Sequence, residues 1–129
     1  MLKTENHFYF IYEYCNDGTL ESIMHLNGTI QEEDAVKIIC QIIKAFKVLV
    51  KDSILHRDLK PGNILFHQGN VKIADFGFCK DLEKNDLTKT MVGSPIYMAP
   101  EVLFGLPYGH TAEVKFYEQL QIYKKINFH

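Results

Sequence analysis

The 129-residue sequence has no tryptophan, only three cysteines and no long uncharged apolar run. The three cysteines stand far apart, which excludes the paired spacing of a zinc site and is typical of free thiols in a reducing compartment: Cys15, Cys40 and Cys79. No run approaches the roughly 20 apolar residues that cross a bilayer, and the first residues show no signal-peptide pattern. We therefore expect a cytoplasmic protein without a membrane span.

A strong charge of one sign is also missing. The formal net charge is -2, which argues against a general nucleic-acid binder or a protein that binds membrane surfaces by charge. The composition is 47% hydrophobic and 12% aromatic, as in globular rather than disordered proteins. The length fits one domain or part of one.

What the sequence does contain is a dense set of polar residues within LHRDLKPGNIL, residues 55–65. Asp58 can accept the proton of a substrate hydroxyl, Lys60 can neutralise charge on a moving phosphoryl group, and Asn63 can hold a metal ion. The spacing therefore indicates phosphoryl transfer. The alternative is a basic surface turn between a helix and a strand.

A second motif, Asp75-Phe76-Gly77, stands 17 positions after Asp58. It follows two short predicted strands, ILF and VKIA, around a Gly-Asn turn, so a β-hairpin is expected directly before it. The pattern predicts Asp75 as the principal Mg²⁺ ligand, Phe76 packed beneath His56, and Gly77 as the residue that permits the backbone turn.

The remaining segments predict the elements around these motifs. Residues 7–15 are aromatic and β-branched, which predicts a buried strand ending at Asn16-Asp17-Gly18. Thr19 can cap a short helix that runs to about Leu26 and ends at Gly28. A long helix is expected over residues 32–52, with a core-facing stripe at spacings of three and four rather than a partner-binding face: Ala35, Ile38, Ile39, Ile42, Phe46, Leu49 and Val50.

Residues 78–92 are polar and show no period, so a surface loop is expected there, of the kind that carries regulation. The segment after it, GSPIYMAPE at residues 93–101, is a third motif. The three motifs, in this order, resemble those of eukaryotic serine/threonine protein kinases, and the resemblance extends from about Asn6 to about Glu113. The segments FYFIYEYCNDGTL, KIADFGF and MVGSPIYMAPE are most similar to the unc-51-like, autophagy-initiating kinases.

This resemblance implies an α+β, protein-kinase-like fold that is truncated to the hinge strand and the first part of the mainly helical C-lobe. Residues 1–113 are then a partial kinase domain and residues 114–129 a divergent helical tail. Residues 55–65 become the catalytic loop and residues 78–92 the activation loop. The implied reaction is transfer of the ATP γ-phosphate to serine or threonine hydroxyls of a protein substrate, with Mg²⁺ as the metal.

The family pattern also implies roles for single residues. Asp58 is the base, Lys60 stabilises charge, and Asn63 and Asp75 bind the metal, while Ser94 is expected to hydrogen-bond near Asp58 and Lys60.

On the nucleotide side, Tyr12 is the gatekeeper and Leu65 the apolar floor under adenine. The backbone amides that meet adenine belong to the hinge residues Glu13, Tyr14 and Cys15.

In the activation loop, Thr90 is the candidate for phosphorylation by an upstream kinase, because its phosphate could pair with Arg57 and Lys80. Thr88 is the weaker candidate. The alternative is an unmodified loop threonine.

The sequence also departs from the family pattern. It holds no GxGxxG, no upstream strand with the phosphate-pairing Lys, and no helix with the Glu partner of that Lys, so Met1 corresponds to an internal position of a longer kinase. Glu113 occupies the place of a structural Asp and Lys115 that of a Trp. A tail helix is still expected, with apolar positions at Phe116, Leu120, Tyr123 and Ile126.

By length the chain is about half of a kinase domain, so we expect it to be marginally folded and to have little or no activity. Two alternatives to an active kinase remain. One is a truncated pseudokinase that acts as a binding module. The other is a fragment of a longer kinase, including an incompletely assembled gene.

Overall fold

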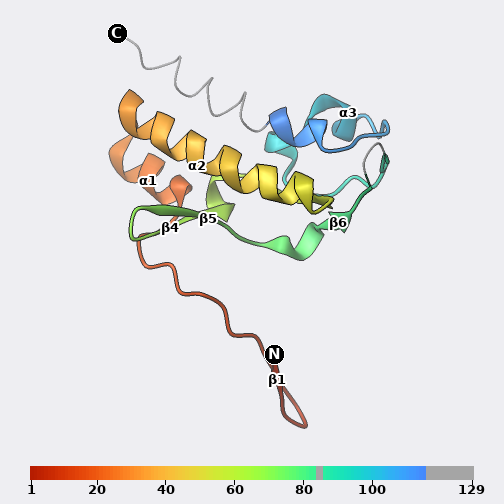
Figure 1. The fold of residues 1–129 in the computed structure, drawn as a ribbon, viewed down its shortest axis with the longest axis horizontal. Helices are drawn as coiled ribbons and strands as arrows, with labels where there is room; N and C mark the ends of the chain where they lie inside the picture. The colour runs from red at the N-terminus through yellow and green to blue at the C-terminus, as the bar shows by residue number, and fades with distance from the viewer. Residues whose placement is uncertain (84–85, 116–129) are drawn as a thin grey trace.

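The computed structural model describes residues 1–83 and 86–115 (Figure 1). Its helices are α1 (Leu20–Asn27), α2 (Glu32–Lys51) and α3 (Pro100–Leu103), and residues 111–115 are also helical. Within these residues the strands form antiparallel pairs: β1 (Leu2–Lys3) with β2 (Phe8–Tyr9), β3 (Ile54–Leu55) with β6 (Lys80–Asp81), and β4 (Ile64–His67) with β5 (Asn70–Ile73). The predicted helical tail beyond residue 115, with Phe116, Leu120, Tyr123 and Ile126, lies outside the described residues.

Helices α1 and α2 pack against the β4–β5 hairpin, while α3 and residues 111–115 lie above the C-terminal half of α2 in the view of Figure 1. The buried side chains divide into two clusters. The first joins α1 and α2 to the hairpin: Leu20, Ile42, Leu59, Ile64 and Phe66. The second lies beneath α3: Leu55, Leu82, Ala99, Val102, Tyr108 and Ala112. The catalytic loop runs between these two clusters and contributes to both.

The predicted helix α1 is confirmed, together with both of its ends. Thr19 Oγ1 accepts from the Ser22 amide at 3.1 Å, and Ser22 Oγ accepts from the Thr19 amide at 2.9 Å. This reciprocal pair satisfies two amide groups that the first turn of a helix leaves unbonded. Gly28 ends the helix with φ at +67°, a conformation that glycine adopts without steric cost.

The long helix is also confirmed, over Glu32–Lys51, with acidic residues in its first turn. Ile42 and Leu49 are buried, and Ile38 and Phe46 pack at the edge of the first cluster. Val50 does not belong to the buried stripe, because its side chain is 42% exposed. The helical rotation of 100° between Leu49 and Val50 turns the second residue away from the core that receives the first.

The hairpin before the second motif is confirmed, but its turn consists of Gln68 and Gly69 rather than Gly-Asn. His67 pairs with Asn70, and the two turn residues have φ values of +51° and +74°. Positive φ at both central residues is the geometry that matches the right-handed twist of two-residue hairpins.

The prediction of a buried strand over residues 7–15 is wrong. Only Phe8–Tyr9 are in a strand, and Ile11 and Tyr12 are 78% and 81% exposed. A strand is buried only where another layer covers it, and within the described residues this segment pairs only with Leu2–Lys3. Figure 1 shows the segment leaving the body of the molecule.

The described part of the activation loop contacts the rest of the molecule at several points. Lys80–Asp81 pair with Ile54–Leu55, Leu82 is buried, and Thr88 pairs with Tyr108 in an isolated bridge. These contacts join residues that lie far apart in the sequence, which is why local periodicity did not reveal them.

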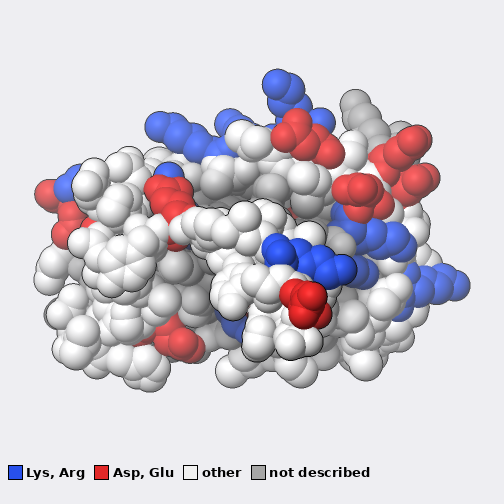
Figure 2. All heavy atoms as spheres, turned by 90° about the horizontal axis from the view of Figure 1, so that it is seen from below, with Lys and Arg blue, Asp and Glu red and all other residues white. Residues whose placement is uncertain are grey.

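The surface agrees with the small net charge. On the face shown in Figure 2, Lys and Arg side chains lie beside Asp and Glu side chains rather than in one large basic area. Among the described helices, none is long and apolar enough to cross a membrane.

Candidate active site

The catalytic loop is held in a tight conformation between β3 and β4. His56 and Asp58 are buried, and Arg57 between them has φ at +68°. Pro61–Asn63 form a 3₁₀ turn, in which the fixed φ of proline suits the first position. With this rarely populated backbone conformation at Arg57, the side chains of Arg57 and Asp58 make separate contacts: Arg57 with the Phe78 carbonyl and Asp58 with Ser94.

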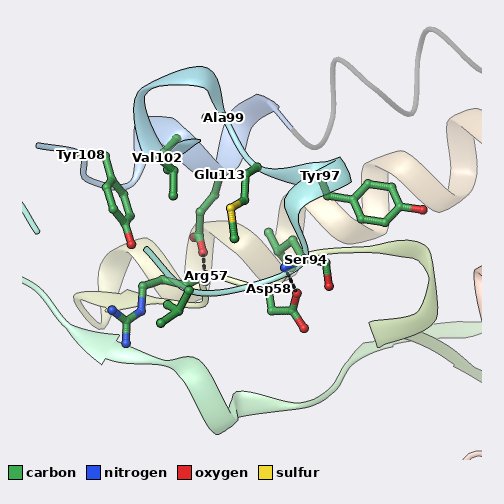
Figure 3. Close-up of a pocket in the computed structure, with 12 residues that line it drawn as sticks. Arg57, Asp58, Ser94, Tyr97, Ala99, Val102, Tyr108 and Glu113 are labelled. Atoms are coloured by element: carbon green, nitrogen blue, oxygen red, sulfur yellow. Dashed lines mark hydrogen bonds between the residues drawn. The ribbon is translucent and has the colours of Figure 1, made fainter. Parts of the chain in front are cut away.

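Asp58 is the centre of a hydrogen-bond network, of which Figure 3 shows the bond from Ser94. Its Oδ2 accepts from Lys60 Nζ at 2.8 Å and from Asn63 Nδ2 at 3.1 Å, and its Oδ1 accepts from the Ser94 amide at 2.8 Å. Burial raises the pKa of Asp58, but the hydrogen bonds from Lys60 and Ser94 outweigh it, so the pKa lies below its ordinary value. The carboxylate is therefore ionised at neutral pH.

Lys60 and Asn63 each make a second contact that fixes their positions. Lys60 Nζ donates to Ser94 Oγ at 2.9 Å, and Asn63 Nδ2 donates to the Asp58 carbonyl at 2.8 Å. The predicted contact of Ser94 with Asp58 and Lys60 is therefore confirmed. Because both Asn63 contacts use Nδ2, its Oδ1 is the atom that suits a hard cation such as Mg²⁺.

His56 holds the catalytic loop in place through hydrogen bonds at both ring nitrogens. Its Nδ1 accepts from the Asp58 amide at 3.3 Å, so its Nε2 carries the proton that is shared with the Ala74 carbonyl at 3.1 Å. Burial lowers the pKa of His56, which keeps this ring neutral. The ring of Phe76 meets it edge-on at 5.0 Å between centroids, as predicted.

Asp75 lies apart from the Asp58 network. Its side chain is exposed and accepts from the Gly77 amide at 3.3 Å, while the preceding Ala74 amide donates to the Asn63 carbonyl at 2.9 Å. The turn is formed by Asp75, with φ at +64°, rather than by Gly77. Aspartate tolerates this conformation because its short side chain bonds to the local backbone, and a Cβ at Gly77 would stand 3.2 Å from Asp75 Oδ1.

The predicted adenine-side residues are near the hairpin but not in contact with the Asp58 network. Leu65 forms a bridge with Thr19, and the Glu13 carboxylate pairs with Lys72 Nζ at 3.0 Å. Cys15 is half-buried and Glu13 is exposed. The structure therefore brings together Asp58, Lys60 and Asn63, and leaves the hinge residues at the edge of the hairpin.

Gly93 allows the activation loop to approach the catalytic loop. A Cβ at this position would lie 2.1 Å from the Arg57 carbonyl oxygen, and φ at Gly93 is +108°. Any larger residue would push the backbone of Ser94 away from Asp58. The glycine of the third motif is thus a requirement of the site.

The two threonines of the activation loop differ in access. Thr88 is only 4% exposed, and its Oγ1 accepts from Lys80 Nζ at 3.0 Å. Thr90 is exposed, and its carbonyl accepts from the Tyr108 hydroxyl.

Glu113 is a site residue whose contact the sequence did not reveal. Its Oε1 accepts from the Arg57 amide at 2.7 Å, although the two residues are 56 positions apart (Figure 3). The resemblance to the kinase family placed Glu113 where that family has a structural Asp, and this was the only sign in the sequence that the side chain is buried. Glu113, Asp58 and Ser94 line one small cavity, with about 40 Å³ open to water, between the catalytic loop and residues 92–113.

Within the described residues, no three His, Cys, Asp or Glu side chains converge as a metal site would require. The two predicted metal ligands would offer oxygen atoms, Asn63 Oδ1 and the exposed carboxylate of Asp75, and oxygen is the kind of donor that Mg²⁺ prefers.

Comparison with known proteins agrees with this geometry. Residues 1–116 match the protein kinase domain family. The chain is 40% identical over 119 residues to human serine/threonine-protein kinase ULK1, covering 84% of this chain and 11% of that protein. It is 35% identical over 123 residues to serine/threonine-protein kinase unc-51 of Caenorhabditis elegans, covering 87% and 14%.

Similarity is not limited to these relatives. The probable serine/threonine-protein kinase KCC4 of Saccharomyces cerevisiae is 41% identical over 114 residues, covering 87% of this chain and 11% of that protein. The chain thus spans a small part of the length of each of these relatives. The family match over residues 1–116, together with the kinase motifs assembled around Asp58, shows that the chain belongs to the protein kinase family.

Proposed function

We propose that this chain carries the catalytic centre of a serine/threonine protein kinase, which transfers the γ-phosphate of ATP to a protein hydroxyl. The observation that carries the proposal is the convergence of Lys60, Asn63 and Ser94 on the buried carboxylate of Asp58. Phosphoryl transfer depends on positioning and electrostatic stabilisation, and this network supplies both on the acceptor side.

In this proposal, Asp58 Oδ1 or Oδ2 receives the proton of the substrate hydroxyl, because the carboxylate is ionised and accepts only. Lys60 Nζ already bridges Asp58 and Ser94, so its charge stands beside the attacking oxygen. Asn63 and Asp75 hold Mg²⁺, which supplies charge neutralisation on the phosphates when bound.

In the proposed site, the hinge residues bind the nucleotide. We propose that the backbone of Glu13 and Cys15 binds adenine and that Leu65 lies under the ring. The Glu13–Lys72 ion pair and the Thr19–Leu65 bridge support this assignment, because they hold the segment from Glu13 to Thr19 beside the β4–β5 hairpin. Residues 1–113 then form the partial kinase domain and residues 114–129 its tail.

We further propose a site of regulation in the activation loop and a cellular role. Thr90 is the candidate for an upstream kinase because it is exposed, whereas Thr88 is buried. The similarity to ULK1 and unc-51 supports a cytoplasmic role in initiating autophagy, with protein substrates.

The test is phosphate transfer from Mg-ATP to a serine peptide and to the same peptide with tyrosine. The matched control is Asp58→Asn, which keeps the shape of the side chain and removes its basicity. We expect transfer to serine only, and a loss of about 10²–10⁴-fold in the variant. Equal rates for the two proteins would overturn the proposal.

A binding module is the second candidate, favoured by the exposed aromatic segment around Tyr12 and Tyr14, which are 81% and 80% exposed. It predicts that Mg-ATP produces no transfer at any pH while the chain still folds. Transfer that disappears with Asp58→Asn would exclude it.

A further inference from the structure

The segment at residues 7–14 combines exposed apolar side chains with a free strand edge. Its large hydrophobic side chains are each at least half exposed: Phe8, Tyr9, Phe10, Ile11, Tyr12 and Tyr14. One edge of β2 pairs with β1, and within residues 1–83 and 86–115 no strand lies along its other edge. Unpaired backbone groups beside apolar side chains are a template for another strand.

The hydrogen bonds of the β1–β2 hairpin show which backbone groups face the free edge. The Thr4 amide donates to the His7 carbonyl at 2.9 Å, so the backbone of His7 faces β1. Successive residues of a strand direct their N–H and C=O groups to opposite edges. The groups of Phe8 therefore face the free edge, and those of Phe10 and Tyr12 do so when the strand continues.

The side chains of the segment already alternate as in a strand. The rings of His7 and Tyr9 lie 6.2 Å apart, and those of Phe10 and Tyr12 stack with 6.3 Å between their centroids. Contacts between side chains two positions apart are those of an extended chain. One face thus carries the residues with odd numbers, and the other carries Phe8, Phe10, Tyr12 and Tyr14.

We propose that this segment pairs with the same segment of a second copy of this chain, antiparallel and centred on Phe10. In this register Phe8 stands opposite Tyr12, and Phe10 stands opposite Phe10 of the second copy. These are the residues whose backbone groups face the free edge, so they form the hydrogen-bonded pairs. The two hairpins then join into one antiparallel sheet.

Charge complementarity selects this register. It places His7 opposite Glu13 of the second copy, and the same contact forms twice because the pairing is symmetric. Lys72 Nζ contacts Glu13 Oε1 at 3.0 Å, which leaves Oε2 to accept from the imidazole of His7. Moving the register by two residues would place His7 opposite Ile11 or Cys15 and lose both contacts.

A second copy suits this edge because the strand is complementary to itself. An isologous contact of this kind closes at two copies, whereas a strand that pairs head to tail would continue into a fibre. Figure 1 shows β1 and the segment after it standing away from the body of the molecule, so a second copy can approach the edge.

The paired strands form a small interface, below about 1,200 Å², so we expect a weak dimer with a Kd of roughly 10–500 μM. The pairing uses neither ATP nor the Asp58 network. The inference therefore goes beyond the proposed function, and either can fail without the other.

The first test is sedimentation equilibrium of the whole chain under reducing conditions, from about 10 μM to 1 mM. We expect one monomer–dimer equilibrium. His7→Glu should weaken the dimer about tenfold, because it places two carboxylates opposite each other at both ends of the paired strands. His25→Glu is the matched control, because it makes the same change at an exposed position in α1, and it should leave the Kd unchanged.

The second test is disulfide trapping under mild oxidation, which reports the register. Phe10→Cys should cross-link two copies through residue 10, because hydrogen-bonded partners have Cα atoms about 5.5 Å apart, within the reach of a disulfide. Tyr12→Cys is the matched control on the same face. Its Cα would lie about 14 Å from the same atom of the second copy, so no link through residue 12 should form.

A chain that stays monomeric up to about 1 mM overturns the proposal, and the edge would then be left to a strand of another protein. Oligomers that keep growing with concentration, equal cross-linking of the two cysteine variants, or an equal Kd for His7→Glu and His25→Glu would also overturn it. The sedimentation of the wild type decides the question even if a variant fails to fold.

Discussion

Single residues set the distance between the activation loop and the catalytic loop, and Gly93 is the most restrictive of them. Its missing Cβ leaves room for the Arg57 carbonyl, and its φ of +108° is one that other residues rarely adopt. The contact between Ser94 and Asp58 depends on this close approach.

We therefore predict that Gly93→Ala lowers the free energy of unfolding by about 2–4 kcal/mol, since a steric overlap adds to backbone strain. Gly105→Ala is the matched control, because Gly105 has φ at +66° with open space around it. It should cost about 1 kcal/mol. Urea unfolding measures both, and equal losses would show that the overlap at Gly93 is relieved without cost.

Lys60 provides a second test at the residue scale. Its ammonium lies 2.8 Å from Asp58 Oδ2, so Lys60→Met should raise the pKa of Asp58 toward its ordinary value. Lys72→Met is the control, because Lys72 pairs with Glu13 instead. NMR titration of the Asp58 carboxyl carbon measures the change, and an unchanged pKa in Lys60→Met would contradict the assigned role of Lys60.

Among the secondary-structure elements, α1 depends on a cap that can be removed by one substitution. Thr19→Ala removes the oxygen that accepts from the Ser22 amide, and we expect a loss of about 1 kcal/mol in the free energy of unfolding. Thr29→Ala, at an exposed position before α2, should be nearly neutral. Urea unfolding would contradict this account if the two variants lost the same stability.

The elements also show what the sequence could predict. Helices α1 and α2 and the β4–β5 hairpin were predicted because caps, spacing and turn residues are local signals. The pairing of β6 with β3 and the exposure of residues 7–15 were not, since both depend on which distant segment lies alongside.

In the candidate site, too, contacts within one loop could be predicted and contacts between distant residues could not. Asp58, Lys60 and Asn63 lie within six positions, so their convergence was predictable from the loop alone. The Glu113 contact joins residues 56 positions apart, and only the folded chain reveals it.

At the scale of the whole molecule, Glu113 links stability to pH. Its pKa of about 7 exceeds the ordinary value of 4.5, so the stabilisation is fully present below pH 4.5 and is lost as the pH rises through 7. This raised pKa makes the free energy of unfolding about 3 kcal/mol lower above pH 7 than below pH 4.5.

We therefore expect Glu113→Gln to be more stable than the wild type at pH 8, with the difference shrinking or reversing at pH 5. Urea unfolding at the two pH values gives the comparison, and the difference between the variants cancels the opposing contribution of His56. An equal difference at both pH values would contradict the raised pKa.

The central proposal is that this chain holds the catalytic centre of a protein kinase around Asp58, with Asp75 as a ligand of the metal. The most direct measurement is calorimetric titration of the 1–129 chain with Mg-ATP, beside Asp75→Ala. The account predicts binding that is abolished or strongly weakened in the variant, since Asp75 would hold the metal that the phosphates share. Absence of binding in a cooperatively folded wild type, or equal binding by both proteins, would contradict it.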